Sequence, residues 1–177
     1  MVHGRSGLDQ LQREPSLDHQ PARERGEPPL IVVLDGIQDP HNLGAIIRSA
    51  HMLGAHGIVI GKDRAAQVTG AVAKASAGAI EHMRVARVVN LGRALEALKE
   101  AGAWMVAADP HAQQEIWDAK LGGPLALVVG SEGAGIREGI LNHCDFRVRI
   151  PTAGRVGSLN ASVSTALVLY EISRQRR

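Results

Sequence analysis

The sequence has a single cysteine and no long apolar run, and both absences limit what the protein can be. With Cys144 alone, one chain can form neither an internal disulfide nor a cluster of thiolate metal ligands. No stretch of about 18 apolar residues could cross a membrane, and the polar first residues lack the pattern of a signal peptide. These features predict a soluble, cytoplasmic protein with no membrane partner.

A strong excess of charge is also missing. The formal net charge of +2 is weak evidence for a nucleic-acid partner, although most basic residues are arginines, whose planar guanidinium can bind two phosphate oxygens at once. Standard zinc-ligand spacings are absent too, so we predict no metal site from the candidate ligands Asp35, His41, His51, His56 and His143.

The chain contains enough apolar sequence for one compact domain. Its 177 residues are 45% hydrophobic, which suffices for a single buried core. Residues 1–29 mix charged and polar residues with proline and glycine, and they cannot bury enough apolar surface to offset the entropy of ordering. We therefore expect a disordered polar tail or linker remnant at 1–29 and a folded domain at 30–177.

Beyond residue 30, apolar strand-like runs alternate with helix-like segments. Alternation of this kind favours an α/β fold, with a mostly parallel sheet and helices on both faces. The predicted strands are 30–34, 57–60, 83–88, 104–108, 125–129 and 146–150, and the predicted helices are 42–53, 67–77, 91–101, 136–143 and 159–174.

Two glycine-rich loops in the last third of the chain each follow an apolar run. One is Gly130-Ser-Glu-Gly-Ala-Gly135, and the other lies within residues 150–160. The spacing is not the G-x-G-x-x-G of a dinucleotide-binding fold, which disfavours that fold. One such loop alone could simply be a tight turn. Two of them together favour a small-molecule site.

A third block of the same kind spans residues 34–48, which read as a strand, a polar turn and a helix. Asn42 could serve only to cap this helix, because asparagine accepts backbone N–H bonds at helix starts. Arg48 could be an ordinary solvated residue. Arg48 lies six positions after Asn42, which places the two side chains on somewhat different sides of the helix, so residue chemistry alone leaves both roles open.

Together the three blocks resemble the SpoU (TrmH-like) class of the SPOUT RNA methyltransferases. Residues 42–48 look like the first motif of the family and residues 130–133 like the second. Ile150-Pro151, with Ser158-Leu-Asn160, looks like the third. The resemblance covers nearly all of residues 30–176, and it implies a fold with a deep C-terminal trefoil knot, against the general rule that chains do not knot.

The resemblance also implies a reaction, a cofactor and a set of site residues. The reaction is methyl transfer from S-adenosylmethionine to an RNA ribose 2'-hydroxyl. Backbone groups near Gly130, Ile150 and Leu159 would contact the cofactor. The residues with implied catalytic roles are Arg48, which aligns with the key catalytic residue of the family, and Asn42, Glu132, Ser158 and Asn160, which would hold Arg48 and the ribose in place.

Residues 39–44, 62–67 and 74–78 are most similar to the enzymes that methylate a guanosine ribose of bacterial large-subunit rRNA. The expected RNA is therefore rRNA. Such enzymes usually carry a further N-terminal domain, which residues 1–29 cannot form, so RNA selection stays open. The alternatives are a tRNA 2'-O-methyltransferase of the same family and a non-catalytic RNA-binding factor for ribosome assembly.

The final helical segment predicts a homodimer. Its apolar residues spread too widely around the helix for one stripe that faces a core. Some of that surface should be buried by a second copy about a two-fold axis, as the resemblance also implies. The apolar residues concerned are Leu159, Val163, Ala166, Leu167, Val168, Leu169, Tyr170 and Ile172.

Overall fold

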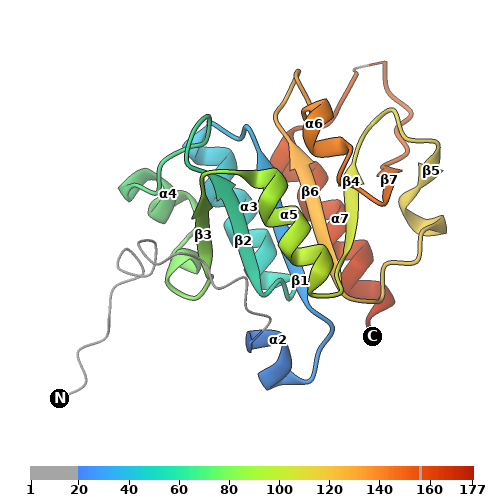
Figure 1. The fold of residues 1–177 in the computed structure, drawn as a ribbon. Coiled ribbons are helices and arrows are strands. Elements are labelled where there is room, and N and C mark those ends of the chain that lie inside the picture. The colour runs from blue at the N-terminus through green and yellow to red at the C-terminus, as the bar shows by residue number, and fades with distance from the viewer. Residues whose placement is uncertain (1–19, 156) are drawn as a thin grey trace.

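The computed structural model describes residues 20–155 and 157–177, which are built around a seven-stranded sheet (Figure 1). Every strand pair in the sheet is parallel, and the strand order is β3-β2-β1-β6-β4-β7-β5. The strands are β1 (Leu30–Asp35), β2 (Gly57–Gly61), β3 (Val85–Val88), β4 (Trp104–Ala108), β5 (Gln114–Glu115), β6 (Leu125–Gly130) and β7 (Phe146–Arg149).

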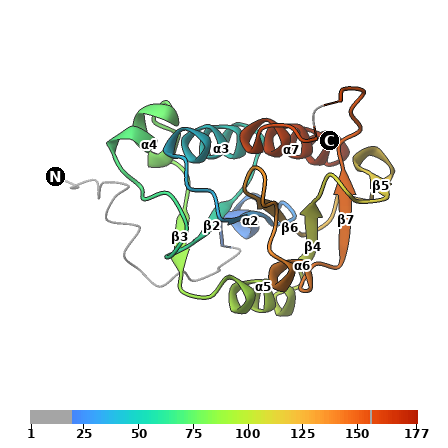
Figure 2. The ribbon, with the colours of Figure 1, turned by 90° about the horizontal axis from the view of Figure 1, so that it is seen from above.

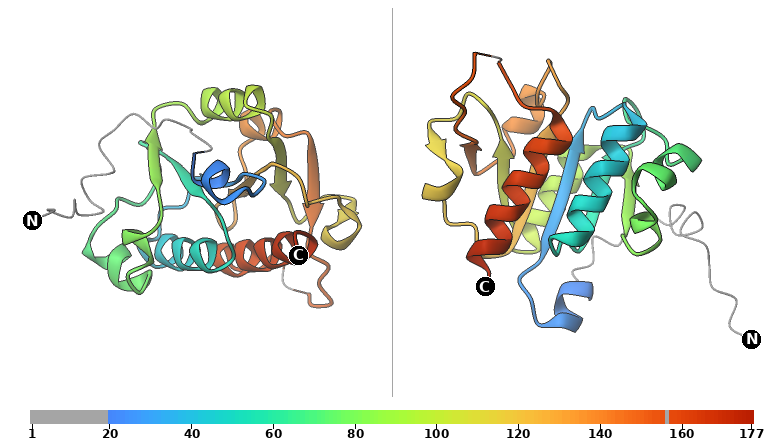
Figure 3. Two further views of the ribbon diagram at one scale, coloured as in Figure 1. Left: turned by 90° about the horizontal axis from the view of Figure 1, so that it is seen from below. Right: turned by 180° about the vertical axis from the view of Figure 1, so that it is seen from behind.

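Helices cover both faces of the sheet, as Figures 2 and 3 show. The helices α3 (Pro40–Met52) and α7 (Ala161–Gln175) lie side by side on one face, and the short α4 (Gly70–Ala75) packs against α3. The helices α5 (Leu91–Glu100) and α6 (Glu138–Leu141) lie on the other face. The predicted mostly parallel α/β fold with two covered faces is thus confirmed.

The two apolar layers explain why the central strands are so uniformly apolar. Along β1, Val32 and Leu34 belong to the core under α3 and α7, whereas Ile31 and Val33 belong to the core under α5. A strand that is buried on both faces needs apolar residues at every position, not at alternate ones.

The structure differs from the predicted tail at residues 20–29. Residues Gln20–Arg25 form the helix α2, where Ala22 is fully buried. Glu27 contacts His56, with 3.0 Å between Glu27 Oε2 and His56 Nε2. The composition misled the prediction because this segment is fixed by a few specific contacts and not by a run of apolar residues. Residues 1–19 of the predicted tail lie outside the described residues.

The end of α7 is fastened to several segments at the amino ends of the strands. The Arg176 guanidinium donates to the carbonyls of Pro28 at 2.7 Å and Gly123 at 2.6 Å. Gln175 donates to the Ala119 carbonyl at 3.0 Å and accepts from the Leu121 amide at 2.8 Å. These contacts fix α7 against the sheet. No helix among the described residues is long and apolar enough to cross a membrane.

Candidate active site

A cavity of about 660 Å³ opens where the loops after β4, β6 and β7 meet at the carboxyl ends of the strands. Ligands in open parallel sheets bind at this edge. Five of the residues that the sequence predicted for the site line this cavity, namely Gly130, Glu132, Ile150, Ser158 and Leu159. The other three, Asn42, Arg48 and Asn160, do not line it.

The loop after β6 folds tightly back on Gly130. An antiparallel bridge joins Ser131 to Gly135, whose amide donates to the Ser131 carbonyl at 2.9 Å. A Cβ atom on Gly130 would overlap the backbone of Gly135 and Ile136. The glycine is therefore required by the packing of the loop itself, whereas the sequence attributed it to the close approach of a ligand.

An ion pair that the sequence did not predict holds the far end of this loop. Asp35, at the end of β1, is 1% exposed. Its carboxylate accepts from the Arg137 amide and from Arg137 Nε, both at 2.8 Å. The hydrogen bond to Asp35 raises the pKa of Arg137. An acid directly after an apolar strand and an arginine directly after a glycine-rich loop were the available signals, but nothing in the sequence connects them.

Three of the predicted polar residues meet in one hydrogen-bonded cluster, which we call the Asn42–Glu132–Asn160 cluster. Asn42 Nδ2 donates to Glu132 Oε1 at 3.2 Å, and Asn160 Nδ2 donates to Asn42 Oδ1 at 3.0 Å. Asn160 Nδ2 and the Ala161 amide also donate to Glu132 Oε1. No described residue donates to Glu132 Oε2, which leaves this oxygen open to a ligand.

Helix capping explains how these side chains come to face one another. Asp39, and not Asn42, caps α3 by accepting from the His41 amide at 3.0 Å. Asn42 is therefore free to reach Glu132. Asn160 caps α7, since its Oδ1 accepts from the amides of Ser162 and Val163, and its Nδ2 group then points toward the cluster.

Arg48 is not brought to the cluster within one chain. It lies exposed on α3 and makes no hydrogen bond or ion pair with any described residue. Six residues along a helix turn a side chain by roughly 240° and advance it by roughly 9 Å. Arg48 therefore lies away from Asn42 on a different side of α3.

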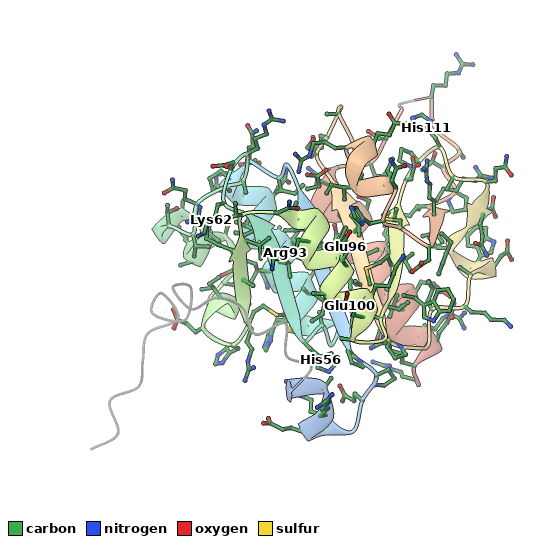
Figure 4. All side chains as sticks on the ribbon, in the orientation of Figure 1. His56, Lys62, Arg93, Glu96, Glu100 and His111 are labelled. Carbon is green, nitrogen blue, oxygen red and sulfur yellow. The ribbon has the colours of Figure 1, made fainter. Side chains whose placement is uncertain are left out.

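The other side of the cavity has polar residues that the sequence did not single out. Asp109 accepts from the His111 amide at 2.9 Å and lies 3.5 Å from Arg147 Nη1, and all three residues line the cavity. His111 is labelled in Figure 4 on the loop after β4. Among the residues that the structure describes, no group of three His, Cys, Asp or Glu side chains could hold a metal ion.

Comparison with known proteins gives a family match over most of the chain. Residues 29–170 match the model of the SpoU rRNA Methylase family. The chain is 51% identical over 158 residues to YacO of Bacillus subtilis, whose name assigns it only provisionally to the TrmH family of tRNA/rRNA methyltransferases. It is 47% identical over 154 residues to the 23S rRNA (guanosine-2'-O-)-methyltransferase RlmB of Photobacterium profundum.

The chain spans about two thirds of the length of these two relatives. The alignments cover 89% and 87% of this chain but only 64% and 63% of YacO and RlmB. Among solved structures, the SpoU methyltransferase AviRb from Streptomyces viridochromogenes in complex with AdoMet superimposes with a TM-score of 0.81 at 35% identity. That superposition covers 92% of this chain and 66% of AviRb.

Proposed function

Because this chain belongs to the SpoU rRNA methylase family, we propose that it transfers a methyl group from S-adenosylmethionine to a ribose 2'-hydroxyl of RNA. The observation that carries the proposal is the Asn42–Glu132–Asn160 cluster, which meets the cavity through Glu132. A polar cluster that opens onto a cofactor-sized cavity is what such a transfer requires, since two reactants must be held together.

The cavity fits the proposed cofactor in size and lining. Its volume of about 660 Å³ falls within the range of small-molecule sites. Apolar side chains of Val129, Ile136, Ile150 and Leu159 supply the lining, together with the backbone at Gly130. These residues would hold S-adenosylmethionine, which supplies a methyl group activated by its positive sulfur. The AdoMet complex of AviRb, at 35% identity, supports this assignment.

We assign the described side chains to holding the reactants and polarising the ribose hydroxyl, whose proton leaves to solvent as the methyl group is transferred. Asn42 and Asn160 hold the Glu132 carboxylate, whose free Oε2 accepts a hydrogen bond from the ribose. Ser158 lines the cavity beside them. The guanidinium of Arg48 offers N–H donors and no acceptor, so we assign it to binding the target phosphate and polarising the hydroxyl.

A homodimer would place Arg48 of one copy near the site of the other copy. An apolar stripe on the outer face of α7 is exposed, with exposed fractions of 47%, 41% and 62% at Val163, Leu167 and Tyr170. The helix α3, which carries Arg48, lies directly beside α7. Two copies that pair through this stripe would bury it and place Arg48 of each copy near the other copy's α7.

The sheet order supports the proposed C-terminal trefoil knot. The strands β4 and β5 are joined by residues 109–113 alone, yet β7 lies between them in the sheet. The chain then returns to β6 through residues 116–124, which contact the end of α7. In the proposed knot, residues 109–124 would form the loop through which the segment from β7 to α7 passes.

The proposed substrate is a guanosine of large-subunit rRNA. RlmB enzymes at 47% and 48% identity support rRNA over tRNA, which stays the alternative within the family. Transfer of labelled methyl from S-adenosylmethionine into unmodified bulk rRNA and into bulk tRNA tests the proposal. We expect incorporation into rRNA at a ribose 2'-hydroxyl. Incorporation into tRNA alone would favour the alternative, and none into either would favour a non-catalytic RNA-binding factor.

A further inference from the structure

The loop of residues 62–69, which follows β2, lies outside the cavity and presents two unpaired cations. Lys62 and Arg64 are exposed, and neither side chain makes a hydrogen bond or ion pair with a described residue. Some other cations on the described surface are held by carboxylates, such as Lys99 by Asp145 at 2.7 Å. Two unpaired cations on one loop can bind an anionic ligand without first breaking an ion pair within the protein.

Backbone contacts hold this loop in a defined position. The Lys62 amide donates to the Val88 carbonyl at 2.8 Å, and Arg87 Nη2 donates to the Lys62 carbonyl at 3.2 Å. At the other end, the Ala66 amide donates to the Ile37 carbonyl at 2.8 Å, and Ala66 is buried. The loop is therefore bonded to the turn that precedes α3, the helix that carries Asn42.

The backbone at Arg64 adopts an unusual conformation. Its φ of 55° lies in the left-handed region, which residues other than glycine rarely occupy. Such conformations persist where the surroundings enforce them, and they cluster at functional sites. The exposed acid Asp63 lies between the two cations, so the loop keeps a net positive charge.

The order of the sheet places this loop in line with the polar cluster. Glu132 follows β6, Asn42 follows β1 and Lys62 follows β2, and these three strands are neighbours in that order. Adjacent strands are about 4.8 Å apart, so two spacings, roughly 10 Å, separate β6 from β2 along this edge. Figure 4 shows Lys62 at the carboxyl end of β2.

We infer that Lys62 and Arg64 bind backbone phosphates of the RNA, next to the nucleotide that the Asn42–Glu132–Asn160 cluster holds. The inference rests on the proposed function. It adds the path of the RNA backbone, which would run along the edge of the sheet from β6 to β2. Contacts to phosphates fix the register of a nucleic acid without reading its bases. The loop therefore contributes affinity and alignment, while the choice of nucleotide lies elsewhere.

The test compares two double variants that lose the same charge. K62Q/R64Q removes both cations of the loop. R84Q/K120Q is the control, since Arg84 precedes β3 and Lys120 precedes β6, which puts both at the opposite end of the sheet, and both are exposed without a described partner. Binding of an unmodified 23S rRNA transcript is measured across salt concentrations, with S-adenosylmethionine titration and thermal unfolding as checks of the fold.

We expect K62Q/R64Q to bind the transcript about tenfold more weakly at low salt and to lower the slope of log K against log salt by about 1.4 to 1.8. KM for RNA should rise at unchanged kcat, and R84Q/K120Q should match the unaltered protein. An unchanged slope, or an equal loss in the control, overturns the inference.

The same experiment separates this inference from the proposed function. A lowered slope in K62Q/R64Q upholds the phosphate-binding loop even if the unaltered protein methylates neither rRNA nor tRNA, in which case only the proposed function fails. An unchanged slope beside normal methyl transfer overturns the loop's role and leaves the proposed function standing.

Discussion

At the scale of single residues, the site depends on which side-chain atoms already form hydrogen bonds within the protein and which do not. Glu132 Oε1 receives N–H groups from Asn42, Asn160 and Ala161 and so is committed to holding the carboxylate in place. The other oxygen is open. Asn160 divides its two ends in the same way, since Oδ1 caps α7 and Nδ2 reaches the cluster.

Arg48 separates catalysis from cofactor binding. It lies on α3, outside the residues that line the cavity. We expect Arg48→Ala to lower methyl transfer at least a hundredfold, because removal of one group that steadies the reacting oxygen typically costs 10²–10⁴ in rate. Affinity for S-adenosylmethionine should stay within a few fold. Calorimetric titration beside a transfer assay checks both, and near-normal transfer would refute the assigned role.

Cys144 should be chemically inert in the folded protein. Burial raises the pKa of its thiol from 9.0 to about 11, which leaves about a hundredfold less thiolate at neutral pH. Because the thiolate is the reactive form, a colorimetric disulfide reagent at pH 7.5 should react far more slowly than with the protein unfolded in guanidinium chloride. Equal rates in the two states would contradict the buried position.

At the scale of elements, the sequence predicted the strands better than the short pieces between them. The run Trp104–Ala108 was predicted to the residue, because all five residues are apolar and the inner three are buried. The helix α2 and the two-residue strand β5 were missed, since neither has an apolar pattern of its own. The Asp35–Arg137 pair was missed because it joins residues 102 positions apart.

The loop after β6 should be sensitive to a single methyl group. Gly130→Ala places a Cβ against the backbone of Gly135 and Ile136, so we expect a loss of about 1–3 kcal/mol of stability together with weaker cofactor binding. Gly139→Ala on α6 is the matched control, because a Cβ there meets nothing within 4 Å. Denaturant unfolding of both variants measures this loss. Equal free energies of unfolding would show that the loop rearranges to accept the extra methyl group.

The contact between β1 and β2 should weaken in acid. Nδ1 of His56 accepts from the Leu30 amide at 3.1 Å, and burial lowers the pKa of His56 below 6.5 although Glu27 opposes this shift. As the pH falls, His56 therefore becomes protonated in the unfolded chain before it does so in the folded protein. The stabilising contribution is therefore complete above about pH 6.5 and declines below it, by at most about 1.4 kcal/mol per pH unit.

Thermal unfolding between pH 7.5 and 5.5 measures this effect. His56→Gln should flatten the pH dependence of the melting temperature, because glutamine does not titrate. His41→Gln, at an exposed position on α3, should leave that dependence unchanged. A His56→Gln protein that keeps the full pH dependence would show that other groups cause it.

At the scale of the whole molecule, the two ends of the sheet have different tasks. The carboxyl ends hold the cavity, the cluster and the cationic loop. The amino ends hold α2, the Glu27–His56 contact and the Arg176 contacts that fasten α7, and Figure 4 shows His56 at this end. Substitutions at the amino end should therefore alter stability more than catalysis.

At the scale of the whole molecule, the apolar stripe of Val163, Leu167 and Tyr170 along α7 is exposed in the single chain. If two copies pair through it, light scattering at micromolar concentration should report twice the 18.8 kDa mass of one chain. Leu167→Glu buries a charge in that interface, so it should yield monomers and abolish methyl transfer while each copy still binds S-adenosylmethionine.

Val89→Glu is the control for this variant, because Val89 is 77% exposed and lies beyond β3, away from α7. It should stay dimeric. We assign Arg48 of each copy to the neighbourhood of the other copy's α7. Leu167→Glu monomers do not pair, so mixing them with Arg48→Ala protein should not restore methyl transfer. A monomeric mass for the unaltered protein with full activity would remove both the dimer and the shared site.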